Sequence, residues 1–348
     1  MAATATSTVV PAAIDRKAVI QRIATQVILL GVVVWLGANL INSPSQFFSA
    51  GMVGLNLGML YALIALGYTL VYGIIELINF AHGDLFMLGA LFSGFLLTTV
   101  MGQDHAGVLG IVLLLLTVVA TMIFCGGINV TLEFVAYRRL RRAPKLAPLI
   151  TAVGMSFILQ FIGLKWNGST PKQWPSVLPE GSFGIGDFQV DYSLLAVIGV
   201  TVPVLLLLRW VITSTRQGKA MRAVAQDQDA ARLMGVNVNR TISFTFLIGG
   251  ALAGTAGVVY QQVVGTTAYN LGYQLGLIAF VSAVLGGIGN ITGAVLGGIL
   301  IGLIQGFNDG LPYGFGQKWS QSVVFAILIL LMVFKPEGLL GRPTTEKV

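Results

Sequence analysis

Long apolar runs, separated by short polar segments, follow one another along almost the entire sequence. A helix needs about 20 apolar residues to cross about 30 Å of hydrocarbon, and these runs approach that length. The pattern therefore predicts an all-α, polytopic membrane protein with roughly ten transmembrane helices. The predicted spans cover residues 24–41, 52–72, 85–100, 108–128, 146–166, 194–212, 242–263, 273–289, 291–307 and 320–334.

The eighth and ninth of these runs are short and meet at Gly289 and Asn290. They predict at least one broken or hairpin segment within the membrane domain. Two alternatives stay open, namely a helical hairpin that does not fully cross the bilayer and a pair of tilted spans. Both alternatives leave the two ends of the chain on the same side.

Lys and Arg residues indicate the orientation, because they gather on the cytoplasmic loops of membrane proteins. With a cytoplasmic N-terminus, the outside loops hold only three basic residues, which are Lys165, Lys172 and Lys318. The inside groups are 16–22, 138–145, 209–240 and 335–347. This segregation predicts a chain with both termini inside the cell. The predicted parts are a cytoplasmic N-terminal extension (1–23), a membrane domain (24–341) and a cytoplasmic tail (342–348).

Composition narrows the class of protein further. The 348 residues are 55% hydrophobic and only 9% charged, which excludes an ordinary soluble domain. The net charge of +7 does not indicate a nucleic-acid partner, because basic cytoplasmic loops account for it. One cysteine and two histidines are too few for a convincing metal site, so we expect neither metal nor cofactor.

A basic loop of residues 209–240, which we call the coupling loop, holds eight charged residues in an otherwise apolar chain. Its residue types predict two short helices along the membrane surface, with Gly235 at the end of the second and Asp227 or Asp229 as its cap. Four apolar side chains are available as contacts for a partner, which are Met221, Val224, Leu233 and Met234. We interpret the loop as a grip for a soluble partner; the alternative is a basic anchor on anionic lipid.

The coupling loop is not itself a nucleotide site. Gly218 and Lys219 are similar to the end of a phosphate-binding loop, but Thr213 stands where the first glycine belongs and Ala220 replaces the required Ser or Thr. We therefore expect no ATP hydrolysis and no catalytic residue in this chain.

Polar residues interrupt the apolar pattern between 67 and 90, where Glu76, Asn79, His82 and Asp84 occur. Polar groups at membrane depth normally face a cavity or another helix, because exposure to lipid is unfavourable. One interpretation is a discontinuous helix near the translocation path, with Glu76, Asn79 and His82 on one face and glycines at the breaks. A cytoplasmic turn capped by Asn79 and Asp84 and a proton relay through His82 and Glu76 are the alternatives.

Three stretches together resemble the permease subunits of branched-chain amino acid ABC importers. They are YALIALGYTLVYGIIELINFAHGDLFMLGA (61–90), GKAMRAVAQDQDAARLMGVNV (218–238) and the glycine-rich AVLGGIGNITGAVLGGILIG (283–302). The resemblance covers about residues 50–341. It implies a multi-pass protein of the bacterial inner membrane that works with a second permease subunit, two cytoplasmic ATPase subunits and a periplasmic substrate-binding protein.

The resemblance also assigns residues to roles. Docking to the ATPase falls on the coupling loop, at Gly218, Arg222, Ala223, Asp227, Ala231 and Gly235. The NFAHG element places Asn79, His82 and Gly83, with neighbouring Glu76, in the translocation region as a hypothesis. The mechanism implied is alternating access, in which nucleotide binding by the ATPases shifts the spans between two states.

Three alternatives to a branched-chain amino acid importer stay open. A urea or short-amide ABC importer would have the same architecture with another cargo. An ion-coupled secondary transporter would need buried acids along its path, for which only Glu76 and Asp84 are candidates. A passive channel would leave the coupling loop without a purpose.

Overall fold

A computed structural model describes residues 16–102, 107–141, 143–144, 146–178, 181–185, 188–335 and 337–341. The N-terminal extension before Arg16, the predicted tail 342–348, His105 and the basic residues Arg142 and Lys145 lie outside the described residues. The chain divides into two compact units, Met1–Pro44 and Ser45–Val348. The first unit contains helix α1 (Arg16–Asn42), and the second contains every element described below except Pro44, the first residue of α2.

Each of the ten predicted apolar runs forms a helix. Besides α1 they are α2 (Pro44–Ile75), α3 (His82–Phe95), α4 (Val108–Leu132), α6 (Leu146–Asn167), α7 (Tyr192–Ser214), α10 (Val238–Val264), α11 (Leu271–Gly286), α12 (Ile291–Gly310) and α13 (Ser320–Phe334). Within the described residues, eight helices are long and apolar enough to cross a membrane. The other two apolar segments, Leu30–Asn42 of α1 and all of α11, are shorter. The fold is thus an all-α polytopic membrane protein.

Short elements join these helices. Two π-helical turns, η1 (Leu96–Val100) and η2 (Glu133–Tyr137), extend α3 and α4, and α5 (Arg138–Leu140) follows η2. Helices α8 (Arg216–Gln226) and α9 (Gln228–Leu233) form the coupling loop, and a 3-10 turn, η3 (Gln317–Trp319), precedes α13. Strand β1 (Lys172–Gln173) pairs with β4 (Thr266–Thr267), and β2 (Ser182–Ile185) pairs with β3 (Phe188–Asp191), both antiparallel. The apolar pattern did not predict these strands, because they are short and lie between the helices.

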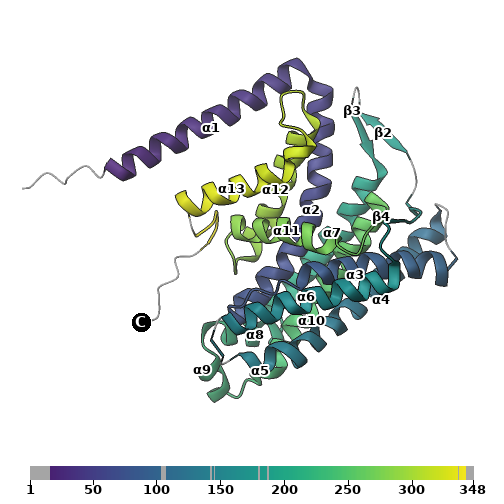
Figure 1. Ribbon diagram of the computed structural model, residues 1–348, viewed down its shortest axis with the longest axis vertical. Helices are drawn as coiled ribbons and strands as arrows, with labels where there is room; N and C mark the ends of the chain where they lie inside the picture. The colour runs from purple at the N-terminus through teal and green to yellow at the C-terminus, as the bar shows by residue number, and fades with distance from the viewer. Residues whose placement is uncertain are drawn as a thin grey trace, which may run out of the picture. The chain divides into compact units, whose positions relative to one another are not determined.

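The centre of the second unit is α3. The first ten residues of α3, 82–91, are all buried, as expected for a helix without a polar face. It packs against α4, α6, α10 and α11, and α10 also packs along α4. Figure 1 shows α3, α4, α6 and α10 running side by side, with α5, α8 and α9 gathered at one end of them. The polar segment 67–90 therefore runs into α3, and the coupling loop runs into α10, so both join this group of four helices.

A seam of glycines lets α12 lie directly against α2. A Cβ atom added to Gly302 would stand 2.2 Å from the backbone nitrogen of Gly58, and one added to Gly298 would stand 2.5 Å from that of Ala62. Only glycine fits at such distances, and small residues are what allow backbones to approach closely within a membrane. The glycine spacing seen in the sequence thus reports helix packing.

Helices α11 and α12 correspond to the eighth and ninth predicted apolar runs. They pack along each other, and a four-residue turn, 287–290, joins them. Gly287 and Gly289 adopt positive φ angles of 103° and 90° in this turn, and the Asn290 side chain caps α12 by accepting from the backbone N–H of Gly293.

Candidate functional site

The coupling loop folds as the two short helices that the sequence predicts. The hydroxyl of Thr215 caps α8 by accepting from the backbone N–H of Gly218. The carboxylate of Asp227 caps α9 by accepting from the N–H groups of Asp229 and Ala230. The segment ends at Gly235, whose φ of +82° is the left-handed conformation expected after a helix. Of the two acids considered as caps, Asp227 fills this role.

Helix α8 is fixed to the end of α7. A Cβ atom on Gly218 would lie 2.3 Å from the carbonyl oxygen of Val211 and 2.2 Å from that of Ile212, so the two backbones are in close contact. The guanidinium of Arg222 donates a hydrogen bond to the same Ile212 carbonyl. Such direct attachment means that a displacement of α8 must also displace α7.

The apolar side chains of the loop divide into two groups. Met221 and Val224 are buried, at 2% and 1% exposure, and belong to the core of the membrane domain. The expectation that they are available to a partner is therefore wrong, because they hold α8 against the spans. Leu233 and Met234, in contrast, are 89% and 84% exposed.

The other predicted docking residues differ in their surroundings. Ala231 is buried at 4% exposure, so it packs α9 against the protein. Ala223 is half-buried, while Asp227 and Gly235 are exposed. Arg232 forms an ion pair of 3.0 Å with Asp229 on the surface. The exposed surface of α9 thus joins two large apolar side chains to a pair of charges.

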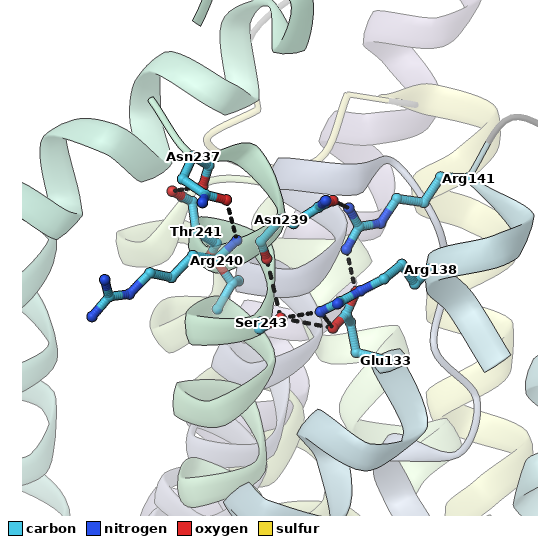
Figure 2. Close-up of polar contacts among 9 residues, drawn as sticks. Glu133, Arg138, Arg141, Asn237, Asn239, Arg240, Thr241 and Ser243 are labelled. Carbon is cyan, nitrogen blue, oxygen red and sulfur yellow. Dashed lines mark hydrogen bonds and ion pairs between the residues drawn. The ribbon is translucent and has the colours of Figure 1, made fainter. Parts of the chain in front are cut away.

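An ion cluster around Glu133, absent from the sequence interpretation, lies beside the coupling loop. The Glu133 carboxylate is fully buried and accepts from the guanidiniums of both Arg138 and Arg141 (Figure 2). The Arg138 bond is bidentate, with distances of 3.1 Å from Nε and 2.8 Å from Nη2. An acid five and eight residues before two arginines was the available signal, but neither separation is the three- or four-residue spacing at which ion pairs on a helix are normally searched.

The same cluster reaches across to α10. The Ser243 hydroxyl donates to Glu133 over 2.7 Å, and Arg141 donates to the Asn239 side chain over 2.7 Å. Figure 2 shows these residues facing one another from the end of α4 and the start of α10. Asn237 begins α10 by accepting from the N–H of Arg240. The residues that follow α9 are therefore tied to α4 by charge-assisted bonds, which are the strong kind.

A non-helical segment separates α2 from α3, as the interpretation of a discontinuous helix predicts. Residues 76–81 are not helical, and Glu76 has a φ of +54° and is exposed. The expectation that Glu76, Asn79 and His82 share one helical face is therefore wrong, since only His82 belongs to a helix. The break lies between Gly73, which is inside α2, and Gly83, which is inside α3.

Asn79 ties this break to two distant helices. Its side-chain oxygen accepts from the Tyr137 hydroxyl over 2.8 Å, and its nitrogen faces the Asn129 oxygen at 3.4 Å. Asn129 in turn donates to the backbone carbonyl of Phe246 over 2.7 Å. These buried amides place the break, α4 and α10 in one hydrogen-bonded network, which rigidifies the region because each member has a partner.

His82 and Gly83 serve close packing at the start of α3. The His82 ring is fully buried and meets the Tyr68 ring edge-on, with centroids 4.7 Å apart. A Cβ atom on Gly83 would stand 2.3 Å from the carbonyl oxygen of Gly272, so α3 touches α11 through its backbone. His82 and the exposed Glu76 thus lie in different environments, one inside the core and one on the surface.

The sequence is similar to those of known transport permeases. The family model described as branched-chain amino acid transport system / permease component matches residues 52–333. The high-affinity branched-chain amino acid transport system permease protein BraD of Pseudomonas aeruginosa is 40% identical over 302 residues, which is 85% of this chain and 96% of the relative. The corresponding protein LivH of Escherichia coli K12 is 39% identical with the same coverage.

Part of the chain is also similar to a permease of a different import system. The autoinducer 2 import system permease protein LsrC of an Enterobacter species is 30% identical over 149 residues, 42% of this chain and 41% of the relative. The matched part of that relative is less than half of its length.

Proposed function

Because the chain belongs to the branched-chain amino acid transport system permease family, we propose that it is the membrane-spanning subunit of an ATP-driven importer of branched-chain or other hydrophobic amino acids. It is a transport subunit of the inner membrane. ATP hydrolysis takes place on two separate cytoplasmic ATPase subunits, a second permease completes the membrane part, and a periplasmic protein delivers the cargo. Both termini lie inside, and the membrane domain has roughly ten apolar helices, of which α11 and α12 form either a pair of tilted spans or a hairpin that does not fully cross.

The observation that carries this proposal is the form of the coupling loop. Leu233 and Met234 are nearly fully exposed at the end of α9, while α8 is attached to α7 and the start of α10 is tied to α4. Large exposed apolar side chains are typical of interaction sites when they lie together. A partner that moves α9 would therefore move three spans, as alternating access requires.

The first test is affinity purification of the chain from its native membranes, followed by mass spectrometry. Recovery of two ATPases and a second permease supports the proposal. Recovery of the chain alone, under conditions that keep other membrane complexes intact, counts against it.

A paired variant tests the docking surface itself. Leu233→Ser combined with Met234→Ser is expected to lower both ATPase co-purification and ATP-dependent leucine uptake about tenfold, because anchors of this kind dominate binding energy. Leu340→Ser is the control, since Leu340 is 42% exposed near the same predicted side but outside α8 and α9. Unchanged uptake in the double variant would remove α9 from the ATPase contact.

Uptake measurements in membrane vesicles distinguish the ATP-driven amino acid importer from the two other kinds of transporter. Dissipating the ion gradient at constant ATP leaves an ATP-driven importer active and stops an ion-coupled secondary transporter. Competition of leucine uptake by urea distinguishes a short-amide importer, which shares the architecture and differs in cargo.

A further inference from the structure

A chamber of about 470 Å³ lies between α2, α6 and α11, beside the α2–α3 break. Its volume is in the range of small-molecule sites, which span about 300–1,000 Å³. Tyr273 on its α11 side is 59% exposed, so the chamber is open there. The residues that line it are Tyr68, Phe80, Val153, Ser156, Phe157, Gln160, Asn270, Gly272, Tyr273, Gln274, Gly276 and Leu277.

The wall of the chamber combines apolar surface with a few polar groups. Aromatic rings and aliphatic side chains make up most of it, and the polar side-chain atoms come from Ser156, Gln160, Asn270, Gln274 and the hydroxyls of the two lining tyrosines. None of the lining residues carries a charge. A surface of this kind suits a ligand with an aliphatic body and a polar end.

Directly behind this wall lies the carboxylate of Asp84, on α3. Asp84 is fully buried, and its Oδ2 accepts from the Ser156 hydroxyl over 2.5 Å. Gln160 donates to the same Ser156 oxygen over 3.2 Å. The backbone of Gly272 covers the other carboxylate oxygen so closely that a Cβ atom there would stand 2.7 Å from Oδ1. Two lining residues, one from α6 and one from α11, thus touch the carboxylate.

One oxygen of the Asp84 carboxylate, Oδ1, lacks a hydrogen-bond donor among the described residues. None of the ion pairs among those residues includes Asp84. Burial of a carboxylate without a cation is unfavourable, so an intramembrane acid of this kind indicates a site for a cationic group. Among the described residues, no backbone N–H donates to the Asp84 side chain, so the carboxylate does not cap a turn there.

We infer that this chamber is a transit site for the amino acid inside the membrane domain, in which Ser156 and Gln160 receive the ammonium group of the cargo and the Asp84 carboxylate behind them supplies the negative charge that attracts it. This inference rests on the proposed function. The aromatic wall holds the aliphatic side chain, and the amide groups of Asn270 and Gln274 are suitable donors for the carboxylate of the cargo. The site binds weakly, because a cargo in transit must also leave it.

The rate at which charged thiol reagents modify a Gln160→Cys variant tests the proposed transit site in the assembled transporter, reconstituted in vesicles. The single native cysteine, Cys125, is fully buried, so the parent chain is the unreactive control. A methanethiosulfonate with an ammonium group is expected to react about tenfold faster than its sulfonate counterpart, relative to a free thiol. Asp84→Asn is expected to abolish this preference. A preference that persists unchanged in Asp84→Asn would overturn the inference.

Ligand protection provides a second measurement that leaves Asp84 intact. Leucine at millimolar concentration is expected to slow the modification of the introduced cysteine, whereas 4-methylpentanoate, which lacks the amino group, is not. Equal protection by both compounds, or none by leucine, also overturns the inference.

The parent transporter separates this inference from the function on which it rests. If it imports leucine with ATP but the thiol results are negative, only the chamber assignment fails. If it imports no leucine, the proposed function fails as well.

Discussion

Glu133 holds together the ion cluster beside the coupling loop. Its carboxylate is fully buried, and the side chains of Arg138 and Arg141 keep 31% and 13% of their exposure. Removing one member of a buried ion pair leaves the others without compensation and costs more than the pair itself contributes.

We therefore expect Glu133→Gln to lower the free energy of unfolding by about 3 kcal/mol. The glutamine keeps the shape of the side chain but leaves two guanidiniums facing each other without an anion. Denaturant titration of the purified chain in detergent measures the change. Asp229→Asn is the matched control, because it breaks an exposed ion pair and is expected to cost less than about 1 kcal/mol. Equal effects of the two substitutions would contradict this role of Glu133.

At the residue scale, the sequence predicted roles for which local rules exist. Asp227 as a cap and Gly235 as a helix stop follow from neighbouring residues alone. The bonds of Glu133 and of the Asn79 network to α10 could not be found in this way, because they join residues 110 and 117 positions apart in the sequence. Met221 and Val224 were assigned to the wrong face, since an apolar residue on a surface helix fits both a core and a partner.

At the scale of the element, α9 has six residues and cannot be stable by its own hydrogen bonds. Its orientation depends on the cap at Asp227, the buried Ala231 and the stop at Gly235. The presence of both short helices was predictable from the residue types, but the attachment of α8 to α7 through Gly218 was not, because it is a contact between two backbones.

Loss of the cap is expected to weaken coupling without unfolding the spans. Asp227→Ala removes about 1 kcal/mol from α9 and is expected to reduce ATP-dependent uptake severalfold, while Asp227→Ser, which also caps, keeps uptake near the parent value. Uptake at matched membrane levels of the protein measures both. If the alanine and serine variants lose uptake equally, the carboxylate has a role other than capping.

At the scale of the whole molecule, the number and order of the apolar helices followed from hydropathy, whereas their neighbours did not. A hydrophobic run indicates that a segment is buried in lipid or protein, but it does not indicate which other helix the segment packs against. The glycine spacing predicted close packing near residues 286–298, yet the partner of α12 could be identified only in the folded chain. The chamber beside the α2–α3 break could not be predicted from the sequence for the same reason, because residues from four separate segments line it.

The α2–α12 seam should be among the positions least tolerant of added volume. Gly302→Val is expected to destabilise the second unit by at least about 3 kcal/mol, because the new atoms meet the backbone of α2, which cannot rotate away. The yield of monodisperse protein after detergent extraction checks this. Gly199→Val on α7 is the control, since nothing lies within 4 Å of its added Cβ atom, and its yield should stay near normal. A normal yield of Gly302→Val would show that the helices separate without cost.

The π turn η2 also has a consequence for the length of the chain. A π turn holds about one residue more than an α turn, so it accommodates an inserted residue while the helical faces before and after it keep their directions. Deleting one residue within 133–137 would restore ordinary α geometry there and leave both faces in register. The same deletion elsewhere in α4 would rotate everything beyond it by about 100°. Single-residue length differences among proteins with this fold should therefore concentrate at η2.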